Sequence, residues 1–354
     1  MATYPKIEVI EEAVTINDSV PGMASSIAVI GAFDSTINDV TSVQSVSQAH
    51  QLFGTTETVD DFKGTDTIDY LFIGASDLLI ANITTWTDDD PSEPETTLTN
   101  AKLADALSKL KDEEFNGLII AEDLTDEAQT MVTSWLATEF KGKFPHGQTL
   151  SFNRQTAQAY ATSVATLGNN VYYPNTQRIE WYGTLLSQTQ STALMAGLIA
   201  SRDINSSLTA KILDGVTGVS PEYSTEEGEI GAKLLELNIP FIDSRNKRLN
   251  KYMVVNSKLP NGLDLSINRS RDYILSRLQV ETQLGNKNND LTMETLTTIV
   301  ENVREEAINT LQLCKDIKYH IERVSSECVD IVIDKIIFDG IITDIKIHYS
   351  VEVQ

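Results

Sequence analysis

Short apolar runs alternate with longer amphipathic segments through much of the chain, and this alternation restricts the fold more than any other feature. Ser26–Ala32 and Gly117–Ala121 have the length and composition of buried strands. Asp126–Lys141 and Leu185–Ser201 have the apolar spacing of helices. Because strands that alternate with helices favour a parallel or mixed sheet covered by helices, the sequence predicts an α/β fold.

The C-terminal third follows a different pattern. Apolar residues recur at three- and four-residue steps from Leu291 to Val324, which predicts one long amphipathic helix after a shorter one at Asn268–Val280. Two β-rich runs, Val329–Phe338 and Ile341–Val353, then flank Asp339-Gly340, the signature of a type I′ hairpin. The predicted fold class is therefore α/β with mixed α+β character, ending in a β-hairpin.

Breaks in composition mark the expected boundaries. Asp88–Glu95 is charged, contains two prolines and lacks apolar residues, which is typical of a loop between structural units. Pro21-Gly22 breaks the chain after the first strand pattern. These breaks predict an N-terminal arm (1–20), an α/β part (21–90), a central α/β domain (96–265), a helical part (266–328) and a β-hairpin with a terminal strand (329–354).

Both ends of the chain carry strand patterns without an obvious partner. Alternating apolar residues define one strand near the N-terminus and a second along the last part of the hairpin. An isolated strand cannot satisfy its backbone groups, and a two-stranded ribbon is marginal in water, so each must pair with something. An edge position in the adjacent domain is an equal alternative for the first strand. The apolar positions are Ile7, Val9, Val14 and Ile16, and then Ile345, Ile347, Tyr349, Val351 and Val353.

The acidic balance argues against several classes of partner. The chain has 51 acidic and 27 basic residues, and its formal net charge is −24. A protein that binds nucleic acid needs a basic surface, and so does one that adheres to an anionic membrane. No signal peptide or transmembrane stretch is visible, and two cysteines are too few for a disulfide framework. We therefore expect cytoplasmic synthesis, no nucleic-acid partner and no membrane insertion.

Motifs that would indicate catalysis or cofactor binding are missing from the sequence. The four histidines are scattered, and two cysteines cannot complete a structural zinc site. Val29–Phe33 follows a strand but lacks the further glycines of a dinucleotide site, and Gly142-Lys143 lacks the rest of a P-loop. The sequence predicts no catalytic residues, no metal site and no cofactor, and hence a protein that is not an enzyme.

Three segments resemble those of contractile phage tail sheath proteins. In that family a strand ending in a Val-Gly-x-Ala motif precedes an aromatic-Gly pair, and an Ala-Gly-x-x-Ala-x-x-Asp helix precedes a Leu-x-Gly-Val-x-Gly segment. The small residues of that helix would allow close packing on the sheet. The matching segments are Ser26–Ser35 with Gln51–Gly54, Ala196–Asp203 with Leu208–Val219, and Leu234–Pro240 with Ile267–Ile274.

The resemblance implies a fold and a function. Sheath proteins have a central domain similar to subtilisin without a working triad, and extended N- and C-terminal arms that exchange strands with neighbouring subunits. Their subunits form six-fold rings around an inner tail tube protein, together with baseplate and tail terminator proteins. A metastable extended sheath contracts and drives the tube through a target cell envelope. The compact length is similar to the sheaths of R-type, diffocin-like bacteriocin particles, which are made in the bacterial cytoplasm.

Two alternatives stay open at this stage. A soluble α/β enzyme or ligand-binding protein with a β-hairpin dimerisation arm would show a pocket of converging polar groups and no self-assembly. A tube or baseplate protein of a phage is a third interpretation, and the helix Ala196–Asp203 speaks against it. If the chain is a sheath, the long helix predicted from Leu291 is a candidate for the surface that faces the tube.

Overall fold

The computed structural model describes most of the chain as two compact units, one within Ile16–Gln279 and the other within Val280–Gln354. The described residues are 26–55, 62–86, 94–122, 124–139, 148–149, 177–246, 251–258, 262–278, 289–325 and 329–339.

A five-stranded sheet with the order β2-β3-β1-β4-β5 forms the centre of the larger unit. β1 (Ser26–Gly31) lies between β3 (Asp77–Asn82) and β4 (Gly117–Ile120) and is parallel to both. β5 (Gln148–Thr149) runs parallel to β4, and β2 (Thr41–Val43) pairs antiparallel with β3. The α/β prediction is thus confirmed.

The boundary expected between parts 21–90 and 96–265 does not separate two cores. β1 and β3 come from the first part and β4 and β5 from the second, yet all four belong to one sheet. Asp88–Glu95 lies in the sequence between β3 and β4, and these two strands both pair with β1.

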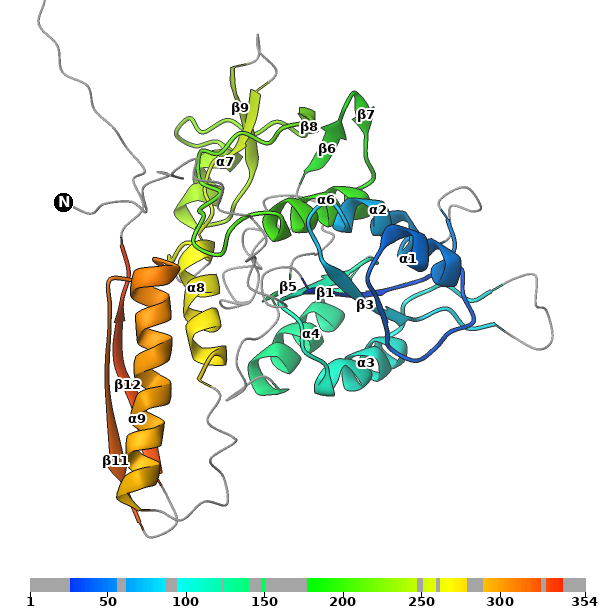
Figure 1. Cartoon of the computed structure of the whole chain (residues 1–354). Coiled ribbons are helices and arrows are strands. Elements are labelled where there is room, and N and C mark those ends of the chain that lie inside the picture. The colour runs from blue at the N-terminus through cyan, green and yellow to red at the C-terminus, as the bar shows by residue number, and fades with distance from the viewer. Residues whose placement is uncertain are drawn as a thin grey trace, which may run out of the picture. The chain divides into compact units, whose positions relative to one another are not determined.

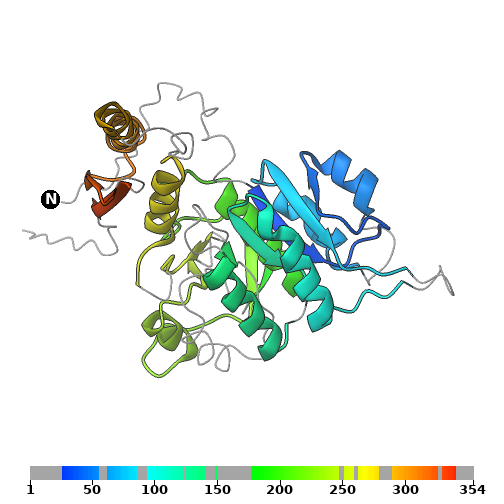
Figure 2. The same cartoon turned by 90° about the horizontal axis from the view of Figure 1, so that it is seen from below.

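Side chains of the sheet alternate between two apolar cores. Ile27 and Val29 of β1 contribute to one core, whereas Ala28 and Ile30 contribute to the other. Figures 1 and 2 show helices on both faces of the sheet. The first face is covered by α1 (Val46–Phe53), α2 (Ile68–Leu71) and α6 (Gln188–Ala200), and the second by α3 (Asn100–Lys109) and α4 (Asp126–Glu139).

Helix α6 approaches α2 so closely that a side chain at Gly197 would not fit. A Cβ added to Gly197 would lie 2.2 Å from the backbone oxygen of Tyr70. A Cβ added to Gly74, just after α2, would lie 2.1 Å from the backbone oxygen of Gly197. Close packing through small residues, predicted for this helix, is therefore found, and its tightest contact is with α2 rather than with the sheet.

The rest of the larger unit is a smaller αβ region. β6 is central in a three-stranded antiparallel sheet with the order β7-β6-β8, and β9 pairs antiparallel with β10. The bounds are β6 (Arg178–Trp181), β7 (Thr184–Leu185), β8 (Val216–Ser220), α7 (Ile230–Glu236), β9 (Ile242–Asn246), β10 (Lys251–Val254) and α8 (Leu265–Ser276). Two short 3-10 turns, Thr65–Thr67 before α2 and Leu110–Asp112 after α3, belong to the region of the five-stranded sheet.

The smaller unit consists of one helix beside a β-hairpin (Figure 1). Its elements are α9 (Asp290–Glu305), a π-helical turn (Glu306–Thr310), β11 (Asp316–Arg323) and β12 (Val329–Ile337). The helix predicted from Leu291 to Val324 is therefore wrong in its second half, and the part expected to be helical over 266–328 is mixed. The helical turns end at Gln312, whose φ of +50° lies in the left-handed region.

The first strand of the predicted terminal hairpin is found as β12, within Val329–Phe338. In the described chain β12 pairs with β11, a strand that the sequence did not predict, and the pairing with Ile341–Val353 stays a prediction. Asp339 follows β12 outside any strand, and the expected second strand, Ile341–Val353, lies outside the described residues.

Candidate functional site

The hairpin of the smaller unit forms a sheet of only two strands in the described part of the chain. β11 and β12 are antiparallel, with Ile317 opposite Ile336 and Tyr319 opposite Ile333. These pairs share the face next to α9, because the Tyr319 hydroxyl donates to Glu301 Oε1 on that helix at 2.6 Å. A two-stranded sheet with a single covering helix is a small structure that a further strand would complete.

Burial differs between the two strands. β11 buries Ile317, whereas no side chain of β12 is fully buried. Complete burial of one Val or Ile side chain stabilises by about 1.5–3 kcal/mol, and a strand or helix that covered β12 would gain part of this at each residue. The partly buried aliphatic residues of β12 are Val329, Ile331, Val332, Ile333, Ile336 and Ile337.

Arg304 fixes α9 against β11. Its guanidinium donates to the backbone oxygen of Ile317 at 3.2 Å and to Asp316 Oδ1 at 3.0 Å. It also donates to Glu301 on its own helix at 3.3 Å. The hydrogen bond from Arg304 lowers the pKa of the Asp316 carboxyl, and burial together with the bond to Glu301 raises the pKa of Tyr319 to about 12. The hydroxyl of Tyr319 therefore stays protonated and donates at any physiological pH.

Two further pairs join elements of the smaller unit, one between β11 and α9 and one between the two strands. Arg323, the last residue of β11, bonds Asp290 at the start of α9 at 3.1 Å. His320 Nδ1 lies 2.9 Å from Asp334 Oδ2 across the two strands, and this hydrogen bond raises the pKa of the imidazole. Exposed pairs of this kind contribute little stability, so their role is to fix the position of the strands.

The nine residues predicted for strand exchange all lie outside the described residues, within 1–25 and 340–354. The structure therefore does not place Ile7, Ile16, Ile345 or Val353, or the five residues predicted with them. Sequence analysis missed β11, because it extended the preceding helix to Val324. The alternation of Ile317, Tyr319 and Ile321 with polar residues is the signal that could have revealed β11.

The larger sheet has a topological switch point, where α/β proteins commonly bind ligands. The chain leaves β1 toward β3 across one face and leaves β4 toward β5 across the other, so a crevice would be expected at the carboxyl ends of the neighbouring strands β1 and β4. Groups of the chain bond one another at this position. Ala32 N, just beyond β1, donates to Glu122 Oε1, just beyond β4, at 3.3 Å, and Glu122 also pairs with Lys63 at 3.3 Å.

More hydrogen bonds join the loop after β1 to the end of β3. Phe33 N donates to Asn82 Oδ1 at 3.1 Å and to Thr84 Oγ1 at 3.0 Å. Asn82 donates to the backbone oxygens of Ser35 at 2.9 Å and Ile37 at 3.1 Å. Asn82 and Thr84 are both buried, so their polar groups hold the chain's own loop in place.

A second buried polar cluster surrounds Asp264. Ser207 Oγ donates to Asp264 Oδ2 at 2.8 Å, and Ser266 donates to Oδ1 through its backbone nitrogen at 2.9 Å. Ser257 bonds the same carboxylate. Among the described residues no histidine bonds to this cluster, so it lacks the base of a serine hydrolase. Asp264 instead caps the start of α8 and joins three chain segments.

Within the described residues, no three side chains of His, Cys, Asp or Glu are grouped so that they could hold a metal ion. No described helix is both long and apolar enough to cross a membrane.

The chain shares sequence and fold with known proteins. Residues 96–249 match the family model described as the phage tail sheath protein central domain. The sheath tail protein of Desulfitobacterium hafniense is 12% identical with a TM-score of 0.65, over 88% of this chain and 96% of that one. The sheath tail protein of Listeria innocua is 12% identical with a TM-score of 0.58, over 85% and 89%.

A third similar structure is the helical sheath of the anti-feeding prophage in its contracted state. It is 15% identical with a TM-score of 0.64, over 94% of each chain. Comparison with curated protein sequences finds no match. The family model and the shared fold confirm the resemblance seen in the sequence.

Proposed function

Because the chain has the fold of tail sheath proteins and carries their central domain at residues 96–249, we propose that it is a structural subunit of a contractile tail sheath. The observation that carries this proposal is the agreement between the family model and a fold that extends over nearly the whole chain. The chain's own groups bond one another at the carboxyl ends of β1, β3 and β4, which fits a structural role, and we predict that the protein is not an enzyme.

Copies of the chain are linked by added strands. An extended segment that joins the edge of an exposed sheet gains main-chain hydrogen bonds and side-chain contacts. The β11–β12 hairpin, with its incompletely buried aliphatic residues, is the acceptor in this proposal. The donors are the terminal segments that contain Ile7–Ile16 and Ile345–Val353.

The assembly consists of six-fold rings stacked around an inner tube protein, between a baseplate and a terminator. The globular units pack in two discrete arrangements, one extended and one contracted, while the added strands keep neighbours connected. A difference of roughly a few kcal/mol at each interface is multiplied over many subunits, so the sheath contracts without a nucleotide or other cofactor. Helix α9 is the proposed tube-facing element, in place of the longer helix expected from the sequence.

The linking role is tested by removing one donor. Deletion of residues 1–18 leaves the described units intact, so the truncated chain should fold with an unchanged circular dichroism spectrum. It should fail to form the tubes or stacked rings that the full chain forms under negative stain, with or without a tube protein. Ordered assembly of the truncated chain at the same concentration would disprove the linking role.

A peptide competitor separates linkage from folding. A synthetic peptide of residues 1–20 in excess should occupy the acceptor hairpin and shorten or abolish the assemblies of the full chain. A scrambled peptide of the same composition is the matched control. Equal assembly with both peptides would show that this segment does not add to an acceptor sheet.

A further inference from the structure

β12 contains a β-bulge. Ile333 and Ile336 both lie on the face next to α9, although residues three apart in an uninterrupted strand lie on opposite faces. Asp334 causes the difference, because Lys335 is opposite Lys318 and Ile333 is opposite the next residue of β11, so that Asp334 has no counterpart there. Asp334 and Lys335 are both exposed, and the bulge therefore places two polar residues in succession on the outer face.

The second edge of β12, away from β11, has a strand sequence close to it in the chain. Within the described residues β12 pairs with β11 alone. Asp339-Gly340 follows β12 and has the composition of a two-residue type I′ loop, which reverses the chain onto the strand before it. Because β11 occupies one edge of β12, such a loop would bring residues 341–349, which lie outside the described residues, onto the second edge.

The bulge fits the register that this loop imposes. A two-residue loop places Thr343 opposite Ile336. Ile345 would then be opposite the charged Asp334 in an uninterrupted strand, but with the bulge it is opposite Ile333. The following apolar residues stay on the face next to α9, in the pairs Ile347–Ile331 and Tyr349–Val329.

The outer face supports the same register. Asp344 comes opposite Lys335, and His348 comes opposite Asp330, so each pair joins an acidic residue with a basic one. Opposite charges on facing strands favour their pairing. A slip of one residue would turn every apolar side chain of the terminal segment to the outer face. Turn, bulge and charges therefore all favour one pairing of residues 341–349 with β12.

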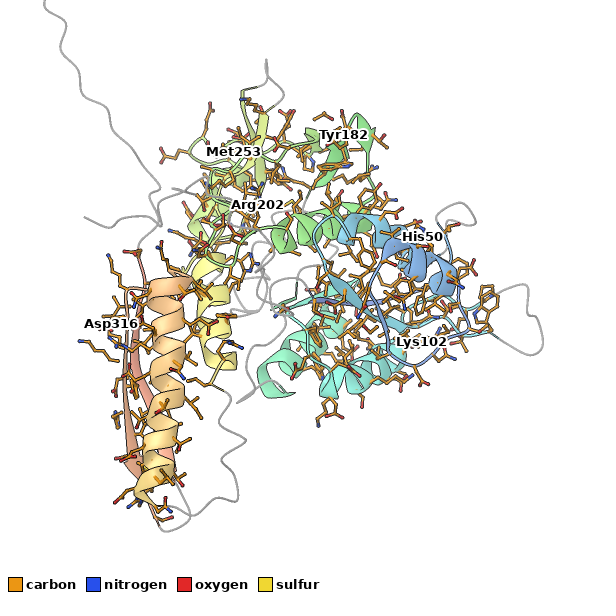
Figure 3. All side chains as sticks on the ribbon, viewed as in Figure 1. His50, Lys102, Tyr182, Arg202, Met253 and Asp316 are labelled. Carbon is orange, nitrogen blue, oxygen red and sulfur yellow. The ribbon has the colours of Figure 1, made fainter. Side chains whose placement is uncertain are left out.

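The structure holds the end of β12 in a different arrangement. A type I′ turn needs positive φ at both central residues, and Asp339 is not among the described residues with positive φ. Its carboxylate forms an ion pair with Lys315, whose backbone nitrogen donates to Ile337 O at 2.7 Å. Asp316, labelled in Figure 3, follows Lys315 and begins β11. The ion pair therefore holds Asp339 on the β11 side of β12, away from the second edge.

We infer that Asp339-Gly340 is a hinge with two arrangements, and that in a single unassembled copy residues 341–349 fold back on the second edge of β12. This closed arrangement covers an edge that could otherwise pair with other chains too early. The open arrangement, with Asp339 bound to Lys315, releases the same strand for exchange with a neighbour. The withholding of the strand rests on the proposed sheath function, whereas the fold-back itself does not.

A disulfide detects the fold-back in solution. Val332 and Lys346 are opposite each other in the closed register, on the outer face. In a Cys328→Ser background of the full-length chain, Val332→Cys with Lys346→Cys should form an intramolecular disulfide at low concentration, seen as a monomer of altered mobility on a non-reducing gel. Ile347→Cys in place of Lys346→Cys is the matched control. Its side chain lies on the other face, so the link should form about tenfold more slowly.

Two substitutions should shift assembly in opposite directions. Gly340→Val puts a β-branched residue where the turn needs positive φ, so it should open the hinge and lower the concentration at which the chain assembles by about tenfold. Lys315→Met removes the partner of Asp339 in the open arrangement and should raise that concentration by about threefold. Lys318→Met, which removes an exposed lysine of β11, is the control and should change nothing. Sedimentation velocity over a range of concentrations measures all three.

The outcomes separate this inference from the proposed function. Absence of the link between positions 332 and 346 in the dilute chain would overturn the fold-back, and so would a Gly340→Val variant that assembles no more readily than the unmodified chain. If the link forms but the chain never assembles around a tube protein, the fold-back stands and the sheath function does not. If tubes form although the dilute chain shows no link, the sheath function stands and the fold-back does not.

Discussion

Replacement of Gly197 by alanine tests the packing of α6 against α2. Alanine favours a helix interior over glycine by about 1 kcal/mol, so propensity alone predicts a more stable protein. The added Cβ would, however, lie 2.2 Å from the Tyr70 backbone oxygen and 3.1 Å from that of Leu71. Backbone oxygens cannot rotate away as a side chain can, so the two helices must separate. Overpacking of a core costs about 1–3 kcal/mol, and the clash here is at the upper end of that range.

The net loss of unfolding free energy should therefore be about 2 kcal/mol, which lowers the melting temperature by about 4–8 °C for a unit of this size. Differential scanning calorimetry of the purified chain measures the shift. Ser108→Ala is the matched control, because Ser108 is exposed on α3 and alanine there gains propensity without a clash. An unchanged or higher melting temperature for Gly197→Ala would refute the argument, because it would mean that α6 and α2 separate without cost.

Three other predictions concern single groups. Asp264→Ala should destabilise the larger unit in urea unfolding by about 1–3 kcal/mol for each buried hydroxyl, of Ser207 and Ser257, that loses its acceptor; a total loss below about 1 kcal/mol would contradict this. In a Cys328→Ser background, Cys314 should react slowly with a thiol reagent at pH 8 until urea is added, because burial raises its pKa to about 11; rapid labelling of the folded chain would contradict it. His320 should titrate above about 6.5 by NMR and return toward that value in Asp334→Asn. The pair stabilises the fold below the ordinary histidine pKa, and this contribution disappears as the pH rises through the raised value; identical titration in both proteins would count against the pair.

The central sheet could be predicted because its signal is local. Ser26–Ala32 and Gly117–Ala121 are apolar runs of strand length, and each became a buried strand of the parallel sheet. Ser45 precedes a short helix and caps it by accepting from Gln48 N, as the sequence pattern suggests. The partners of each strand were not predictable in this way. β1 pairs with β3, which precedes the charged segment Asp88–Glu95 in the sequence, and with β4, which follows it. Composition indicates a break in the chain there, but it does not indicate which strands pair with each other.

The C-terminal error has a specific physical cause. Ile317 and Ile321 are four residues apart, a spacing that places both on one face of a helix. Tyr319 lies two residues from each of them, and this two-residue spacing places all three on one face of a strand. The end of the helix depends on Gln312 at positive φ, and glutamine carries no signal for that conformation.

The position of β1 in the middle of the sheet has a consequence for synthesis on the ribosome. β1 is made first, but its two hydrogen-bonding neighbours, β3 and β4, emerge only after many more residues. At about 5–20 residues per second, several seconds pass in which an aliphatic strand has both edges open. Such a strand can pair with nascent chains on neighbouring ribosomes. The acidic composition of the chain then protects it before any fold exists, because like-charged nascent chains keep apart.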